Sequence, residues 1–179
     1  MLRRMFPILL LAVACGGGAV RGDEEQDAAF HLSSASFEKT ATRIHWVAAA
    51  NSIGEKQGFF NALMADWSNF GHLLTQPEQN DVLYWMALAQ IELNDANAEL
   101  NAGLQHEIAG VNWYTWATDQ NNQGNFTEAI YGALQAIAEF TLAQGRFSAA
   151  IGNANDAFNH CIQADIILRN YRPPAPPPV

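Results

Sequence analysis

Residues 111–137, VNWYTWATDQNNQGNFTEAIYGALQAI, predict two helices that fold back on each other around a turn at Gln123–Gly124. Gly124 suits the left-handed residue that commonly ends a helix. Asn125 and Glu128 have the spacing of a capping box, in which two side chains satisfy backbone amides at the start of the next helix. Because short turns join antiparallel neighbours, this helical hairpin is the starting point for predicting the fold.

The second helix of the hairpin carries apolar residues at alternating spacings of three and four. This period predicts one wide apolar face, and its many alanines allow a neighbouring helix to approach closely. The face consists of Phe126, Ala129, Ala133, Ala136, Phe140 and Ala143, flanked by Ile130, Leu134 and Ile137. The first helix supplies a bulkier counter-face from Val111, Trp113, Trp116 and Ala117.

The rest of the chain predicts further helices separated by short turns. Apolar residues recur at helical spacing along residues 36–51, 59–74, 82–93, 96–109 and 147–168. Thr75 to Glu78 form another capping box, with a proline in the first turn. We expect breaks at Gly54–Gly58, Asn94–Asp95, Gly110 and Gln144–Gly145. No alternating β-branched run is present, so the prediction is an all-α fold of about six to seven helices in antiparallel hairpins.

The hairpin resembles a tetratricopeptide-type repeat. That family places an aromatic residue and a hydrophobic–small pair on the first helix, a glycine and an aromatic at the turn, and two small residues on the second helix. Phe147 follows Trp113 by 34 residues, the usual period of this repeat, although the unit at Trp85 is offset by only 28. Two arrangements therefore stay open, tetratricopeptide-like hairpins and a helical bundle. The matching residues are Trp113, Trp116, Ala117, Gly124, Phe126, Ala129 and Ala136.

The N-terminal segment predicts a targeting signal rather than part of the folded domain. A basic head, residues 1–4, precedes an apolar run that is too short to span a bilayer. Residues 11–15, LAVAC, resemble the bacterial lipobox, in which small residues lead up to a cysteine that is diacylated. The resemblance implies a lipoprotein signal peptide at residues 1–14 and lipidation of Cys15. An ordinary signal peptide cut after Ala14 is the alternative. Gly16 stands where an aspartate can mark inner-membrane retention, which favours the outer membrane.

Three further segments follow from composition. Glycines and acidic side chains predict a flexible acidic tether at residues 15–32. Residues 33–171 form the predicted all-α domain. The proline-rich residues 172–179 predict an exposed polyproline rod.

Charge and cysteine content narrow the possible partners. The chain has a net charge of −9 and only two lysines, so we expect no binding to nucleic acid. If Cys15 is acylated, Cys161 has no partner within the chain, and its place in an apolar stripe predicts a buried, inert thiol.

The sequence carries no recognisable catalytic or cofactor motif, so we expect no enzyme, no cofactor and no metal site. Five histidines leave open a metal held between helices: His31, His45, His72, His106 and His160.

Trp113, Tyr114 and Trp116 cannot all face inward on one helix, and exposed aromatic residues often anchor partners. Our hypothesis is a lipid-anchored envelope protein in which these residues bind another envelope or membrane protein, as an adaptor or as an accessory subunit. The alternative is a periplasmic helical bundle that binds a small apolar ligand or a metal.

Overall fold

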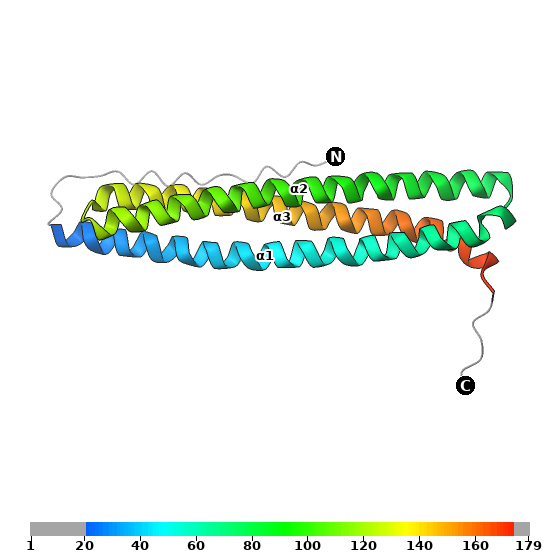
Figure 1. Ribbon diagram of the computed structural model, residues 1–179, viewed down its shortest axis with the longest axis horizontal. Coiled ribbons are helices and arrows are strands. Elements are labelled where there is room, and N and C mark those ends of the chain that lie inside the picture. Colours follow the sequence, from blue (N-terminus) through cyan, green and yellow to red (C-terminus); the bar gives the residue numbers. More distant parts are fainter. Residues whose placement is uncertain (1–20, 174–179) are drawn as a thin grey trace, which may run out of the picture.

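The computed structural model describes residues 21–173, which form an elongated bundle of three long helices (Figure 1). They are α1 (Arg21–Phe70), α2 (Gln76–Asn122) and α3 (Phe126–Leu168), with short 3-10 segments η1 (Gly71–Leu73) and η2 (Arg169–Tyr171). α2 runs antiparallel to α1 and α3 (Figure 1). Residues 21–173 contain no strand, which confirms the all-α prediction. The prediction of six to seven helices is wrong, because this part of the chain has three long ones.

The excess helices came from predicted turns that lie inside helices. Gly54–Gly58 is within α1, Asn94–Asp95 and Gly110 are within α2, and Gln144–Gly145 is within α3. A glycine costs a helix about 1 kcal/mol relative to alanine, and burying a long apolar face outweighs that cost. Of the two arrangements left open, the described residues therefore adopt a bundle of long helices rather than short repeated hairpins.

Two predicted helix boundaries are confirmed. At the start of α2, Glu78 Oε2 accepts hydrogen bonds from the Thr75 amide (2.9 Å) and from Thr75 Oγ1 (2.7 Å). Gly124 separates α2 from α3 with a φ of +78°, the left-handed conformation that the turn requires. The second capping box is wrong in detail: the Asn125 side chain makes no capping bond, and its Nδ2 donates to Gln120 Oε1 instead (2.9 Å).

The domain begins earlier than predicted. Residues 21–32, assigned to a flexible tether, are the first turns of α1. Ala28 is fully buried and lies seven residues before the buried Ala35, so the apolar stripe extends past the predicted boundary at residue 33. Asp23 and Glu24 lie in the first turn, where carboxylates interact favourably with the helix dipole. The predicted signal peptide at 1–14, the rest of the predicted tether at 15–20 with Cys15, and residues 174–179 of the predicted tail lie outside the described residues.

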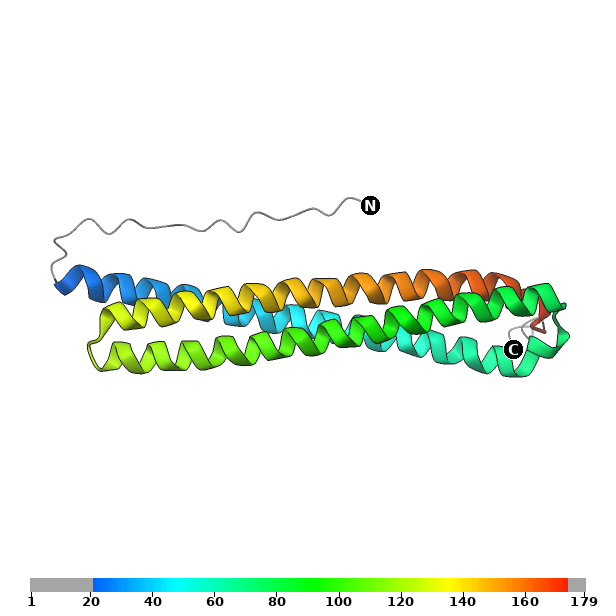
Figure 2. The same ribbon diagram turned by 90° about the horizontal axis from the view of Figure 1, so that it is seen from above.

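A seven-residue repeat of small side chains forms the contact between α2 and α3. Such a repeat keeps one seam in contact through a left-handed supercoil, and small side chains let the helices approach closely. Figure 2 shows α1 crossing behind this pair at a shallow angle. The fully buried alanines of α3 at this spacing are Ala129, Ala136, Ala143, Ala150, Ala157 and Ala164. The matching buried positions of α2 are Ala89, Ala96, Gly103, Gly110 and Ala117.

Two fully buried phenylalanines of α3 fill the space that α2 leaves at its glycines. A Cβ atom added at Gly103 would lie 2.4 Å from Phe147 Cε1, and one added at Gly110 would lie 2.6 Å from Phe140 Cε1. These distances are far below van der Waals contact, so each ring occupies the volume of the absent side chain.

A buried polar contact joins α1 to α3. Thr42 is fully buried, and its Oγ1 lies 2.8 Å from the Glu38 carbonyl oxygen and accepts from Gln144 Nε2 (3.1 Å). Gln144 Nε2 also donates to Glu38 Oε2 (2.8 Å). Because a buried hydroxyl needs a hydrogen-bond partner, this contact favours one register of α1 along α3.

Candidate partner-binding groove

The three aromatic residues singled out in the sequence lie on two sides of α2. Trp113 and Trp116 lie beside each other, with ring centroids 5.8 Å apart at 86°. Tyr114 instead is partly buried on the side of α2 that meets α1, with Lys39 Nζ 5.3 Å from its ring centroid. The structure therefore brings Trp113 and Trp116 into one site and places Tyr114 outside it.

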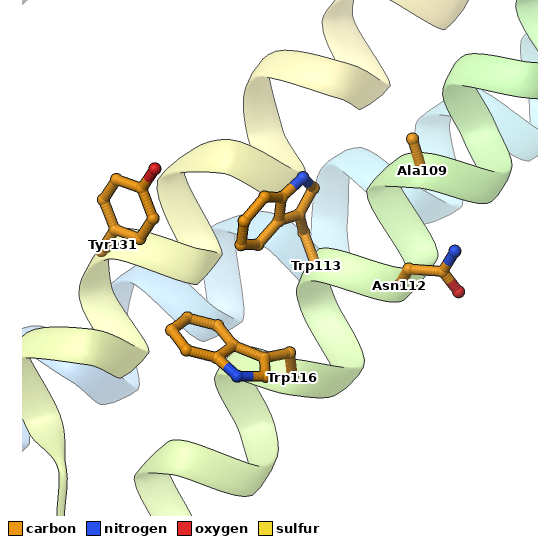
Figure 3. A pocket seen from close by; sticks show the side chains of 5 residues that line it. All are labelled: Ala109, Asn112, Trp113, Trp116 and Tyr131. Carbon is orange, nitrogen blue, oxygen red and sulfur yellow. The ribbon is translucent and has the colours of Figure 1, made fainter.

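Tyr131 of α3 completes this aromatic site, and sequence reasoning missed it. Its ring centroid lies 5.9 Å from that of Trp113 at 88°, an edge-to-face arrangement (Figure 3). The fraction of the residue left exposed is 54% for Tyr131 and 37% for Trp116. Counting residues from the turn could have identified Tyr131. In an antiparallel pair of helices, residues at equal distances from the turn lie opposite each other. Tyr131 and Ala117 are both seven residues from Gly124, so Tyr131 is expected to lie near Trp116, the neighbour of Ala117.

Gly132, which follows Tyr131 on α3, explains why the Trp116 indole can lie against this helix. A Cβ atom added at Gly132 would meet Trp116 Cε3 at 2.6 Å and Ala117 Cβ at 2.9 Å. The absence of a side chain at Gly132 thus makes room for the indole. A tryptophan held in this way presents a fixed apolar surface.

These side chains line an open surface hollow of about 600 Å³, which we call the aromatic groove (Figure 3). Its lining comes from α2 and α3 alone and is mostly apolar. Pockets of this size suit an apolar group that is oriented by a few polar contacts. The lining residues are Ala109, Asn112, Trp113, Trp116 and Tyr131.

The titratable residues considered as metal ligands lie elsewhere. His106 Nδ1 lies 2.7 Å from Glu139 Oε2 and links α2 to α3, while His160 stacks on Trp85 at 5.7 Å. Within residues 21–173, no three or more His, Cys, Asp and Glu side chains are arranged to hold a metal ion. None of the helices in that range is both long and apolar enough to cross a membrane.

Cys161 is buried in the core, as its place in the stripe predicted. Burial raises the pKa of its thiol from 9.0 to about 11. Because the thiolate is the reactive form, the thiol is poorly reactive at neutral pH.

The predicted tail begins as part of the bundle rather than as a free rod. Arg172 pairs with Asp66 of α1 and with Asp165 of α3. Tyr171 donates from its hydroxyl to Glu78 Oε2 (2.8 Å). Hydrogen bonds from the Thr75 side chain, the Thr75 backbone and Tyr171 lower the pKa of Glu78. These contacts connect the segment after α3 to the last turns of α1 and to the first turn of α2.

The described residues thus form a long three-helix bundle with a seam of small residues between α2 and α3 and an aromatic groove on the surface of these two helices. Comparisons of the chain with protein families, with curated proteins and with solved structures found no significant match.

Proposed function

We propose that the protein is a lipid-anchored lipoprotein of the cell envelope that binds another envelope or membrane protein through the aromatic groove. It acts there as an adaptor or as an accessory subunit. The observation that carries the proposal is the cluster of Trp113, Trp116 and Tyr131, which stays accessible although burying it would be favourable. Accessible aromatic residues of this kind dominate the energy of many protein interfaces.

The chemistry of the groove indicates what it accepts. Its lining offers apolar ring surface, the Asn112 amide and the Tyr131 hydroxyl, and it holds no carboxylate or ammonium group. We therefore expect an apolar side chain, aliphatic or aromatic, carried by a helix or an extended segment of the partner.

The position of the groove fits a partner at the membrane. Figure 1 shows that α1 begins and α2 ends at the same end of the bundle. The residues that line the groove belong to the last turns of α2 and the first turns of α3, which lie toward that end. Trp116 is six residues from the end of α2, or about 9 Å along the helix. Cys15 precedes Arg21 by six residues, and a chain of that length spans at most about 20 Å. Acylation of Cys15 would hold this end of the bundle close to the bilayer, because each buried methylene contributes about 0.8 kcal/mol. Gly16 after the cysteine favours the outer membrane.

Cys15→Ser tests the anchor. We expect the variant to lose incorporation of labelled palmitate and to leave the membrane fraction, because the lipid can attach only to the thiol. Cys161→Ser is the matched control and should keep both properties. Labelling that survives in Cys15→Ser, or that is absent from the unaltered chain, would contradict the lipoprotein proposal.

A photo-reactive residue placed in the groove tests partner binding. At Trp116 or Tyr131, we expect cross-linking in native membranes to one protein of defined mass. The exposed Tyr84, at the other end of α2, is the control and should not give this product. Against the purified partner, Trp116→Ala should then weaken binding about tenfold or more, since aromatic anchors contribute at least 1–2 kcal/mol. Tyr84→Ala should leave affinity within about twofold. Equal cross-linking at position 84, or unchanged affinity of Trp116→Ala, would contradict partner binding through the groove.

A groove of about 600 Å³ is also large enough for a small apolar ligand, which is the second candidate function. Native mass determination of the full-length protein, purified from its own membrane in mild detergent, separates the two. An assembly that contains a second kind of protein at fixed stoichiometry supports the partner. Chains of this protein alone, carrying the extra mass of a small molecule, support the ligand.

A further inference from the structure

α1 carries a second apolar stripe that faces away from the other two helices. Phe30, Phe37 and Ile44 are seven residues apart and are 67%, 71% and 66% exposed. Ser34, Ala41 and Ala48 alternate with them at spacings of three and four, so the stripe has the pattern of a coiled-coil seam. We call these six residues the outer seam.

The face of α1 that bears the outer seam has no charged side chain over a long stretch. Between Asp27 and Glu55, α1 contains only three Asp, Glu, Lys or Arg residues. All three contact a residue of α2 or α3, although Lys39 and Arg43 stay exposed to solvent. Glu38 Oε2 accepts from Gln144 of α3, Lys39 lies over the Tyr114 ring, and Arg43 pairs with Glu107 at 3.7 Å. The uncharged face is therefore about 40 Å long, whereas the solvent face of a helix is normally rich in charge.

We propose that a second copy of this chain covers the outer seam, with the two α1 helices antiparallel and a two-fold axis beside Phe37. In this pairing Phe37 packs against Phe37 of the partner subunit, and Phe30 packs against Ile44 of the partner subunit. The stripe is thus complementary to itself, as an interface between identical subunits must be. Neighbouring serine and alanine side chains allow the helices to approach closely.

Charge favours the antiparallel orientation of the second copy. Each chain carries a net charge of −9, which opposes association of two copies, and an uncharged contact face keeps that repulsion small. A parallel pair would bring the acidic starts of both helices together. The antiparallel pair separates them by roughly 35 Å, beyond the screening length at physiological salt. The acidic residues concerned are Asp23, Glu24, Glu25 and Asp27.

The three large side chains of the outer seam supply much of the area that a specific contact needs. Phe30, Phe37 and Ile44 of two copies would bury about 600–1,000 Å², a large part of the 1,200 Å² or more that stable interfaces bury. No residue of α1 lines the aromatic groove, so the dimer leaves that groove accessible. The dimer is therefore independent of the proposed partner-binding function.

Single cysteines in the outer seam test the pairing, using the full-length chain in mild detergent and mild oxidation. We expect Phe37→Cys alone to give a disulfide-linked dimer. Phe30→Cys and Ile44→Cys should cross-link when mixed but not separately, because each faces the other across the axis. The unaltered chain and Tyr84→Cys, on exposed α2 surface, are the controls and should stay uncross-linked. Equal self-linking at all three seam positions would overturn the antiparallel dimer, and so would no linking at any of them.

The mass of the full-length protein in solution gives a second test. We expect a dimer that Phe37→Glu weakens at least tenfold, with unchanged helix content because Phe37 makes little contact within its own chain. Leu142→Glu is the matched control, since Leu142 is equally apolar and half-exposed but lies on α3. A single-chain mass across the concentration range, or a different protein cross-linked at position 37, would overturn the proposal.

Discussion

Replacing Phe147 with alanine is expected to lower the free energy of unfolding by about 3–5 kcal/mol. The side chain is fully buried and packs in a cluster with Ala96, Ala143 and Ala150. The other fully buried members of this cluster are alanines, which are too short to fill the vacated space. Gly103 on the opposite helix has no side chain. Ile53, Leu100 and Leu104 are the larger neighbours, and we expect them to fill only part of the cavity.

Chemical denaturation of the full-length protein at one fixed concentration, followed by helical circular dichroism, measures this loss. Leu142→Ala is the control on the same helix. Leu142 is half-exposed, and we expect a cost below about 1 kcal/mol. A loss at Phe147 no larger than the loss at Leu142 would mean that α2 and α3 do not meet at this ring.

The sequence predicted a turn correctly where local chemistry alone decides it. Gly124 takes a left-handed conformation and Thr75 pairs with Glu78, and both signals involve residues within a few positions of each other. The break at Gln144–Gly145 failed for the opposite reason. Ala143 and Phe147 are four residues apart, so the apolar stripe passes Gly145 without a change of phase. A turn would have disturbed that phase, and the unbroken spacing was the stronger signal.

A glycine can mark a turn, as Gly124 does, or a close contact between helices, as Gly110 does, and the sequence alone did not distinguish the two. Gly110 was interpreted as a break, yet it is buried in α2 because Phe140 occupies the space beside it. The residue that explains Gly110 lies 30 positions further along the chain. Only the register between α2 and α3 connects them, and that register depends on α2 continuing past the predicted break.

The candidate site was predicted only in part, because its residues also depend on how α2 and α3 are aligned. Trp113 and Trp116 could be identified from one helix, because three aromatic residues so close together cannot all be buried. Assigning Tyr114 to the side that meets α1, and Tyr131 to the groove, requires knowing which faces of α2 meet α1 and α3. Counting outward from Gly124 supplies this information once the hairpin is accepted. Cys15, the predicted lipidation site, lies outside the described residues.

The double variant Gly103→Ala with Gly110→Ala is expected to lower the free energy of unfolding by about 2–4 kcal/mol. Alanine is the better helix former by about 1 kcal/mol at each position, so local propensity alone predicts a gain. Each added methyl, however, would lie within 2.6 Å of a phenylalanine ring that is fully buried. Overpacking of this kind costs up to about 3 kcal/mol per site, which exceeds the gain. The two sites are about 10 Å apart along α2, so their costs should add.

The double variant Gly145→Ala with Gly152→Ala is the matched control, because these glycines are also seven residues apart within a long helix. Both are exposed, and an added Cβ at either would meet nothing within 4 Å. We therefore expect this variant to raise the free energy of unfolding by about 1–2 kcal/mol, from propensity alone. Opposite signs in the same denaturation assay would establish that the glycines of α2 hold the two helices close. If both variants were stabilised, the small-residue seam would have no packing role, and the long helices would need another explanation. Adding Phe147→Leu to Gly103→Ala should recover part of the loss, since a smaller side chain leaves room for the methyl.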